Sequence, residues 1–421
     1  MTDALNHLVV DGNEVLELKL VRTVKDIEDD EASFGPEMCH QVFGENEKIF
    51  GYTDLNIKLY YSAGSLQTYL GIDYTNKIEP SKTDGMKADD VDGALRKVLA
   101  PGYVTNLDRF ISLLGKDRNF VPHGQLEHAF PLESRDGGEK RLFEVYYSET
   151  STPGFLAYHQ RLQTFLLWYI DAASFIDVDD DQWTFFTVFE KYWTSDGEVR
   201  YATAGYATVY RYYAYPRHTR PRVSQVLTLP PFRKMGLCAA LLQASTLFNS
   251  NKFLLLSELF SVYSHFMSQP EVVDITVEDP SPEFQRIRDY VDAKNCESLS
   301  AFQPAKLLHG FSPEMEKQAR KKFKINKKQA RRVYEILRLK STNTSDKTAY
   351  LSYRLDVKNR LNAPFQKKKL EMKKLQKVLN SDEYMATLTS TGANETQSRL
   401  SSQYLDLEEE YRRVIHRMDH D

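Results

Sequence analysis

Cysteine is scarce in this sequence, and the few cysteines present have no pairing pattern. Cys39, Cys238 and Cys296 are far apart among 421 residues and form no CxxC pair. This spacing provides neither a disulfide framework nor a cysteine metal site, so we expect a reducing, intracellular setting and no metal. The chain has no run of eighteen apolar residues and no basic region before an apolar one at its N-terminus, which argues against membrane spanning and secretion.

The sequence also lacks the glycine-rich motifs that bind nucleotides. Neither GxxxxGK[ST] nor GxGxxG occurs, which excludes a Walker loop and a dinucleotide fingerprint. The segment LTLPPFRKMGLCAALL, residues 227–242, instead runs from an apolar strand through two prolines and a basic turn into a helix. Because the first N–H groups of a helix are unpaired, an anion-binding corner at Gly236 is one reading. A single glycine at such a turn more often has a purely structural role.

Charge is segregated along the chain, although the net charge is only −4. Residues 25–47 hold eight acids and one lysine, a second acidic group occupies 177–181, and 316–340 holds eleven Lys/Arg and two Glu. Each run taken alone is typical of a solvated face. The two acidic groups together favour a basic partner over nucleic acid, which they would repel. The basic run could also serve nuclear import.

The order of expected elements indicates an α+β protein. Short strands and two short helices are expected up to about residue 120, a long helix over 155–177, and then three strands, a turn, a helix and the strand EVVDITVEDPS. Beyond Pro282 the pattern is almost wholly helical, with polar linkers expected at 340–350 and 380–400. Strands in the first part and helices in the last are typical of an α+β layer arrangement.

Several stretches carry a family resemblance. RPRVSQVLTLPPFRKMGLCAALL resembles the fourth strand, phosphate turn and helix of GCN5-related N-acetyltransferases (GNAT), whose turn pattern Q/R-x-x-G-x-G/A falls on Arg233, Gly236 and Cys238. Cys238 departs from the usual Gly or Ala. Four further stretches make the resemblance more specific. They are YHQRLQTFLLWYIDAASFIDVDDDQW, TRPRVSQ, DITVEDP and KFKINKKQARRVYEILRL. Over nearly its whole length the chain resembles the catalytic subunits of type B histone acetyltransferases.

The resemblance implies a GNAT acetyltransferase core, residues 123–300, preceded by an N-terminal α+β domain, 1–122. A C-terminal helical domain, 301–345, and a partly flexible helical tail, 346–421, would follow. It implies acetyl transfer from acetyl-CoA to lysines in the tail of newly synthesised, non-nucleosomal histone H4, by direct attack in a ternary complex. It also suggests a WD-repeat histone chaperone as partner and a location in nucleus and cytoplasm, with no direct binding of nucleic acid or membrane.

The resemblance also assigns roles to residues. Glu278 would be the general base, with Asp279 assisting at a bend near Pro280, and Asp171 would be a third carboxylate, on the helix, where the family usually has Glu. The cofactor-binding positions would be Val226, Leu227, Thr228, Arg233, Lys234, Met235, Gly236, Leu237, Cys238, Ser281 and Phe284. The histone-tail positions would be Glu45, Asn46, Glu47, Trp183, Tyr210, Arg211 and Tyr212. From pattern alone, the aromatic residues among them fit a core role equally well.

Two rival interpretations remain open at this point. One is a histone-binding or chaperone module with a degenerate acetyl-CoA site, favoured by Cys238, Lys234, Asp171 and an insert around 244–257. The other is an acetyltransferase for N-terminal amines or small molecules, which would not need the acidic groups. An unusual insert around 244–257, including STLFNSNKFLLLS, is either a retained intron translated in frame or a genuine surface insertion.

Overall fold

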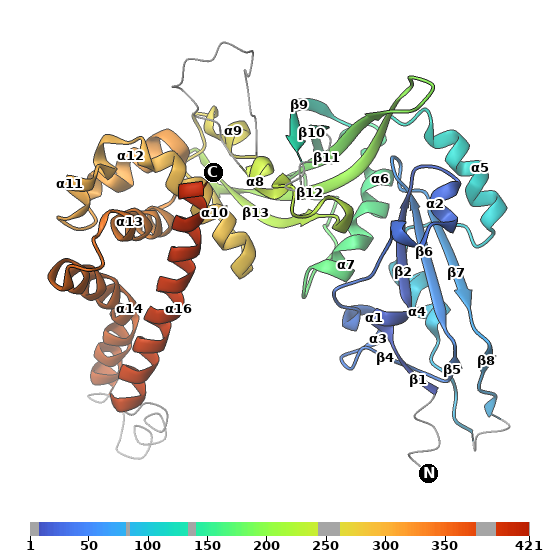
Figure 1. The fold of residues 1–421 in the computed structure, drawn as a ribbon, viewed down its shortest axis with the longest axis horizontal. Helices are drawn as coiled ribbons and strands as arrows, with labels where there is room; N and C mark the ends of the chain where they lie inside the picture. Colours follow the sequence, from blue (N-terminus) through green and yellow to red (C-terminus); the bar gives the residue numbers. More distant parts are fainter. Residues whose placement is uncertain (1–7, 81–84, 134–139, 243–261, 376–392, 421) are drawn as a thin grey trace. The chain divides into compact units, whose positions relative to one another are not determined.

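The fold is described by a computed structural model, which covers residues 8–80, 85–133, 140–242, 262–375 and 393–420 (Figure 1). The chain forms two compact units, the first reaching His265 and the second beginning at Phe266. The unusual insert predicted at 244–257 lies outside the described residues. Strands dominate the first unit and helices the second, so the predicted α+β class is confirmed.

The first unit begins with a small four-stranded sheet of order β3-β2-β6-β7, in which β2 and β6 are parallel and the other pairs antiparallel. Its core is apolar because Leu16, Leu18, Ile57 and Leu59 alternate inward on the two central strands. The strands are β1 (Val9–Asp11), β2 (Leu16–Val21), β3 (Ser33–Phe34), β4 (Lys48–Phe50), β5 (Tyr52–Thr53), β6 (Asn56–Ser62), β7 (Thr68–Asp73) and β8 (Asn76–Lys77). The helices are α1 (Gly12–Val15), α2 (Lys25–Glu28), α3 (His40–Phe43), α4 (Val91–Val98) and α5 (Leu107–Asp117).

A larger antiparallel sheet follows, in which β9 to β13 pair in chain order. Its strands are β9 (Gln125–Glu133), β10 (Lys140–Glu149), β11 (Trp183–Trp193), β12 (Val199–Ala214) and β13 (His218–Thr228), and the short helix α8 (Leu237–Leu242) comes after β13. The middle of β11 is buried on both faces, which explains its largely apolar sequence. Backbone and side-chain hydrogen bonds such as Thr203 N to Ala63 O, 2.7 Å, join this sheet to the N-terminal elements.

The long helix predicted over 155–177 ends earlier than expected. A continuous helical stretch runs through α6 (Phe155–Leu162), a 3-10 turn (Gln163–Phe165) and α7 (Leu166–Tyr169). Ile170 is extended and Ala172 has φ +54°. The side-chain amide of Gln41 binds both the N–H and the C=O of Ala173, at 3.1 and 2.8 Å. This distant partner satisfies the backbone outside the helix, so the helical periodicity of the sequence does not decide where the helix ends.

The second unit is helical around one apolar core, which includes Phe302, Met315, Val333, Tyr334 and Tyr411. Its helices are α10 (Pro282–Glu297), α11 (Pro304–Leu307), α12 (Pro313–Phe323), α13 (Lys327–Ser341), α14 (Lys347–Leu375) and α16 (Ala393–His420). Helix α9 (Val262–Met267) lies at the division between the units. The predicted C-terminal helices are therefore present, and only 342–346 separate α13 from α14, so the linker predicted at 340–350 is wrong in extent.

The predicted strand EVVDITVEDPS is much shorter than expected. Only β14 (Thr276–Val277) is a strand, preceded by a bridge between Ile275 and Ile325. The bounds of the four expected domains stay predictions. The first expected domain and residues 123–242 of the second lie in the first unit, whereas residues 266–300 of the second lie in the second unit.

Candidate active site

The turn between β13 and α8 presents an open backbone. Lys234 and Gly236 have φ of +64° and +87°, and a Cβ built on Gly236 would meet no atom within 4 Å. Left-handed residues in a turn aim successive N–H groups to one side. Among the described residues no acceptor is found for the amides of Lys234, Met235, Gly236 and Leu237. These residues therefore fit an anionic group such as a pyrophosphate, with the exposed Lys234 adding positive charge.

Arg233 supports this turn from within the protein. Its Nε donates to the carbonyl of Thr228 at 3.1 Å, its Nη1 pairs with Glu37, and its guanidinium lies 5.0 Å from the Tyr169 ring. The guanidinium thus ties the end of β13 to a segment near the N-terminus. Arg233 acts first as a brace, and it retains donors on Nη2 for a ligand.

Strand β13 alternates in the register expected of a half-buried strand. Leu227 is buried and pairs with Tyr206, while Val226 and Thr228 lie on the opposite, partly exposed face. A bulge interrupts the pairing with β12, where the Thr208 hydroxyl accepts the Gln225 amide at 3.0 Å. Bulges bend a strand and leave local backbone groups unpaired. The predicted cofactor positions on β13 therefore lie next to a local irregularity of the sheet.

Asp171 lies in the turn after α7 and not on the helix as predicted. Its carboxylate is exposed, and Oδ1 lies 3.1 Å from Nε2 of His40 at the start of α3. The same segment reaches β13, because Gln225 Nε2 donates to the Ser174 carbonyl at 2.8 Å. The structure therefore brings Asp171 near both the N-terminal helix α3 and the strand that carries the predicted cofactor positions.

The carboxylate of Glu47 accepts hydrogen bonds from neighbouring groups of the protein. It accepts the amides of Cys39 and His40 at 2.7 and 3.1 Å and the side-chain amide of Asn13 at 2.9 Å. The Cys39 amide, followed by the Asn13 side chain, holds the pKa of Glu47 below its usual range. The neighbouring Glu45 and Asn46 are exposed. Of the three predicted tail contacts in this loop, Glu45 and Asn46 are the accessible ones.

The aromatic tail positions form one cluster. Trp183 packs edge-on against Tyr210 with ring centres 5.0 Å apart, and Tyr210 contacts Tyr212 at 4.6 Å. The Tyr210 hydroxyl donates to Asp180 at 2.9 Å. Arg211 donates to the Asp181 carbonyl at 2.9 Å and braces this turn. Tyr212 is 41% exposed, so the cluster is not simply core.

Glu278, Asp279, Ser281 and Phe284 belong to the second unit. Glu278 and Asp279 are exposed just beyond β14, and Asp279 has φ +27°. Because β14 has ended, the alternation of a regular strand does not separate their side chains, and the bend lies at Asp279 itself. The Ser281 hydroxyl caps α10 by accepting the Phe284 amide at 3.2 Å.

Two contacting residues escaped the sequence reasoning. His40 lies between Asp171 and Glu47, with Nδ1 3.7 Å from Glu47 Oε1, and Glu37 holds Arg233. Both lie in the acidic stretch 25–47, but nothing in the local pattern separates them from its solvated acids. Within the described ranges, no three His, Cys, Asp or Glu side chains are grouped to hold a metal. No helix of those ranges is long and apolar enough to cross a bilayer.

Comparisons with known proteins give the class of this site. Residues 8–171 match the sequence model described as histone acetyl transferase HAT1 N-terminus, and 288–339 match that of the histone acetyltransferase type B catalytic subunit, C-terminal. The class is thus that of histone acetyltransferases, enzymes whose acetyl donor is acetyl-CoA.

The relatives narrow the class to a family. The chain is 45% identical to the histone acetyltransferase type B catalytic subunit of Mus musculus over 96% of this chain and 93% of the relative. The figures for the Homo sapiens protein of that description are 45%, 96% and 92%, and for one from Dictyostelium discoideum 33%, 84% and 76%. The chain belongs to the family of type B histone acetyltransferase catalytic subunits.

Proposed function

We propose that this chain acetylates lysine side chains in the N-terminal tail of newly synthesised, non-nucleosomal histone H4. The observation that carries the proposal is the open, positively charged turn at 233–237 in a chain of this family, in the same unit as the exposed acids and aromatics. Acetyl-CoA supplies the acetyl group as a thioester. The amides of Lys234 to Leu237 would bind its pyrophosphate, and Val226 to Thr228 would lie along its pantetheine arm.

The reaction needs a base because the substrate amine is protonated near neutral pH, with an ordinary pKa of about 10.4. Glu278 would take one proton from the ammonium group, directly or through one water. The freed nitrogen would then attack the thioester carbonyl, and the new C–N bond would form as the C–S bond breaks. The second proton lost by the nitrogen would balance the proton gained by the departing sulfur, so that coenzyme A leaves as the thiol. Exposure of Glu278 beyond β14 supports this role, since a base for an incoming tail has to be reachable.

Binding of a basic tail is supported by the acidic and aromatic groups of the first unit. Glu45 and the acids at 177–181 would attract Lys and Arg, while Trp183 and Tyr212 would cover their aliphatic stems and make cation–π contacts. The same proposal includes a WD-repeat histone chaperone as partner and a location in both nucleus and cytoplasm. The basic run 317–332, considered as an import signal, forms parts of helices α12 and α13.

The decisive experiment is acetylation of an H4 tail peptide by the purified full chain and by Glu278→Gln. We expect kcat to fall by about 10²–10⁴-fold, the usual contribution of a general base, with little change in acetyl-CoA affinity measured by calorimetry. The matched control is Glu283→Gln, at an exposed glutamate whose carboxylate pairs with Arg286 at 2.9 Å. Full activity of Glu278→Gln would reject it as the base, and absence of acetyl-CoA binding by the native chain would favour the chaperone interpretation.

A further inference from the structure

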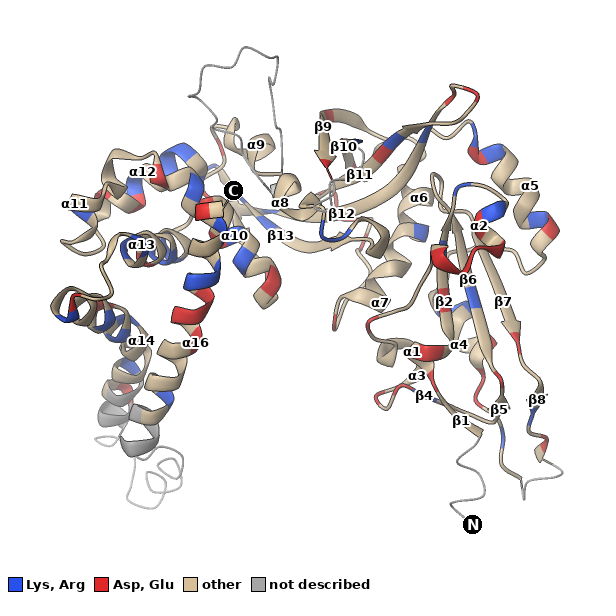
Figure 2. Cartoon of the chain, viewed as in Figure 1, with Lys and Arg blue, Asp and Glu red and all other residues tan. Residues whose placement is uncertain are grey.

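A positively charged cavity lies in the second unit and contains none of the residues proposed for acetyl transfer or for binding of the histone tail. It has a volume of about 520 Å³ between the N-terminal half of α13 and the middle of α14. Figure 2 shows Lys and Arg positions along α12 and α13. The residues that line the cavity are Phe311, Lys327, Lys328, Arg331, Arg332, Asp356, Asn359 and Arg360.

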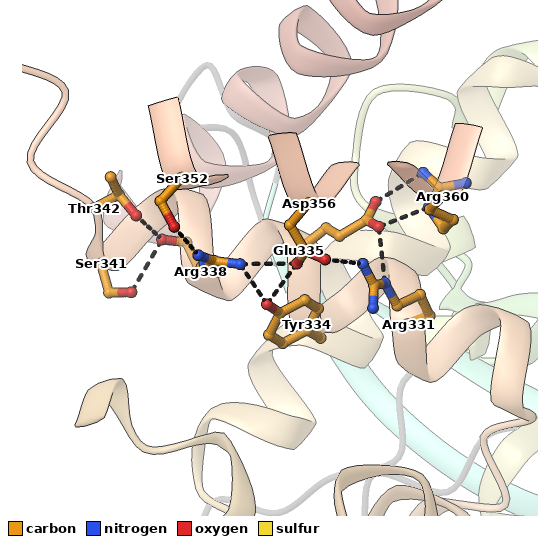
Figure 3. A network of polar contacts seen from close by, with 9 residues as sticks. All are labelled: Arg331, Tyr334, Glu335, Arg338, Ser341, Thr342, Ser352, Asp356 and Arg360. Carbon is orange, nitrogen blue, oxygen red and sulfur yellow. Dashed lines mark hydrogen bonds and ion pairs between the residues drawn. The ribbon is translucent and has the colours of Figure 1, made fainter. Parts of the chain in front are cut away.

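Buried carboxylates bind the three arginines of this cavity on the side that faces the protein interior. Glu335 is fully buried and accepts Arg331 Nε at 3.0 Å and both Nε and Nη2 of Arg360 at 2.6 and 2.7 Å (Figure 3). Asp289, also fully buried, accepts Arg332 Nε at 2.8 Å and pairs with its Nη2 at 2.7 Å. The guanidinium planes are therefore fixed before any ligand arrives.

The same contacts leave one edge of each guanidinium available. Arg331 uses Nε and Nη2, the latter for Asp356 at 2.8 Å, while Arg332 and Arg360 use the same pair of atoms for their carboxylates. No partner among the described residues is found for the Nη1 group of any of the three. Each Nη1 carries two N–H donors, and the side chains keep 20 to 34% of their surface exposed. The site thus offers oriented donors with little ordering cost.

Two lysines and the N-terminus of α13 add to the positive electrostatic potential of the cavity. Lys328 is exposed and has no partner among the residues described, and Lys327 is 71% exposed and reaches Glu316 at 3.4 Å. Both occupy the first turn of α13, whose dipole favours negative charge. Phe311 gives the wall an aromatic surface, over which the Arg331 guanidinium lies at 5.5 Å.

We propose that this cavity binds an acidic peptide segment of a partner protein, through carboxylates that accept from the three free Nη1 groups and from Lys328. Guanidinium groups recognise carboxylates in forked geometry, and Phe311 suits an apolar residue beside the acids. A basic histone tail is repelled by these cations. The small, concave shape and the carboxylate of Asp356 in the wall favour a short acidic segment over a nucleic-acid strand, which needs a longer basic track.

The test uses the full chain and a fluorescent octapeptide of seven glutamates and one phenylalanine, titrated at about 150 mM salt, a concentration that screens exposed charges beyond roughly 8 Å. We expect saturable binding that Lys328→Glu weakens about tenfold and that Asn359→Asp also weakens. Lys306→Glu, a reversal of the same size at an exposed lysine of α11 outside the cavity, is the matched control and should change the affinity less than twofold.

Three results would overturn the proposal. The first is the absence of saturable peptide binding. The second is equal weakening by Lys328→Glu and Lys306→Glu, which would mean diffuse attraction. The third is tighter binding of an eight-nucleotide single-stranded DNA probe than of the peptide. H4 acetylation by Lys328→Glu should equal that of the native chain, so failure of this proposal is distinguishable from failure of the acetyltransferase proposal.

Discussion

The exposed acids of the first unit and the cationic cavity of the second use carboxylates in opposite ways. In the first, Glu45, Asp171 and Asp181 are exposed, so their oxygens face water and any basic ligand. In the second, Glu335 and Asp289 are completely buried and hold arginines whose outer edges face water. The charge that a surface offers is therefore set by which member of each ion pair is buried.

The difference has a physical reason. A buried carboxylate is tolerated only when its oxygens are paired, and Glu335 satisfies this with Arg331, Arg360 and the Tyr411 hydroxyl at 2.9 Å. An arginine has five N–H donors, so it can satisfy such a carboxylate and still keep donors for a ligand. One polar cluster can thus stabilise the helical unit and present a charged surface.

The comparison is tested most strongly by Glu335→Gln against Glu45→Gln. Removing the charge of Glu335 leaves two arginines without their buried partner, so we expect the unfolding free energy of the second unit to fall by about 3–5 kcal/mol. Glu45→Gln at an exposed site should change stability by less than about 0.5 kcal/mol. Circular dichroism during urea unfolding measures the helical unit.

Tryptophan fluorescence provides the internal control, because Trp168, Trp183 and Trp193 all lie in the first unit and the second unit's sequence contains none. Its transition should move little in Glu335→Gln. Equal shifts for the two variants would contradict the assignment of a structural role to the buried carboxylate alone.

A buried carboxylate that is not held by two arginines should make the stability of the second unit depend on pH. Asp292 is 1% exposed and its nearest cation is Arg288, whose Nε is 3.5 Å away. Burial raises the pKa of this carboxyl to about 7. Between pH 4 and 7 the folded state then holds a proton that the unfolded state has lost, so stability falls as the pH rises, by at most about 1.4 kcal/mol per pH unit.

Asp292→Asn mimics the protonated form of the Asp292 carboxyl group, so the variant should lack the decline in stability that this group causes between pH 4 and 7. Its urea midpoint relative to the native chain is expected to increase from pH 5 to 7 and to level off above about pH 7. Asp406→Asn, at an exposed aspartate of α16, should give a curve parallel to that of the native chain. Parallel curves for Asp292→Asn as well would mean that Asp292 is ionised in the folded state throughout this range.

The sequence predicted well those features that depend on neighbouring residues. The strand, proline turn and helix at 218–242 and the helices α12 and α13 are local patterns of turn chemistry and apolar period. The family resemblance supplied the candidate site residues, and their catalytic and binding roles stay predictions.

The features that could not be predicted depend on contacts between distant residues. Gln41 decides the backbone geometry at Ala173, 132 residues away, and His40 reaches Asp171 across a similar span. The internal use of Glu47 depends on the amides of Cys39 and His40 being aimed at it. The apolar periodicity of the sequence does not indicate such pairings, because each side chain could equally have faced water.

The smallest expected effect concerns Asp171, whose carboxylate is exposed and lies next to the His40 ring. His40 has a carboxylate oxygen near each ring nitrogen, Asp171 at 3.1 Å and Glu47 at 3.7 Å, and Glu47 is itself fixed by backbone amides. This makes His40 a positioning residue for the exposed Asp171 if that carboxylate acts in acetyl transfer. We expect His40→Ala to lower kcat for the H4 peptide about tenfold, the cost of one lost orienting hydrogen bond of roughly 1.4 kcal/mol.

Two features distinguish positioning from general support of the fold. KM for the peptide and for acetyl-CoA should stay within twofold in His40→Ala, and His40→Gln, which can still donate to Asp171, should recover part of kcat. In an Asp171→Asn background, His40→Ala should cost little more, because both changes remove the same interaction. His309→Ala, at an exposed histidine of the second unit, is the matched control. Additive losses in the double variant would show that His40 acts independently of Asp171.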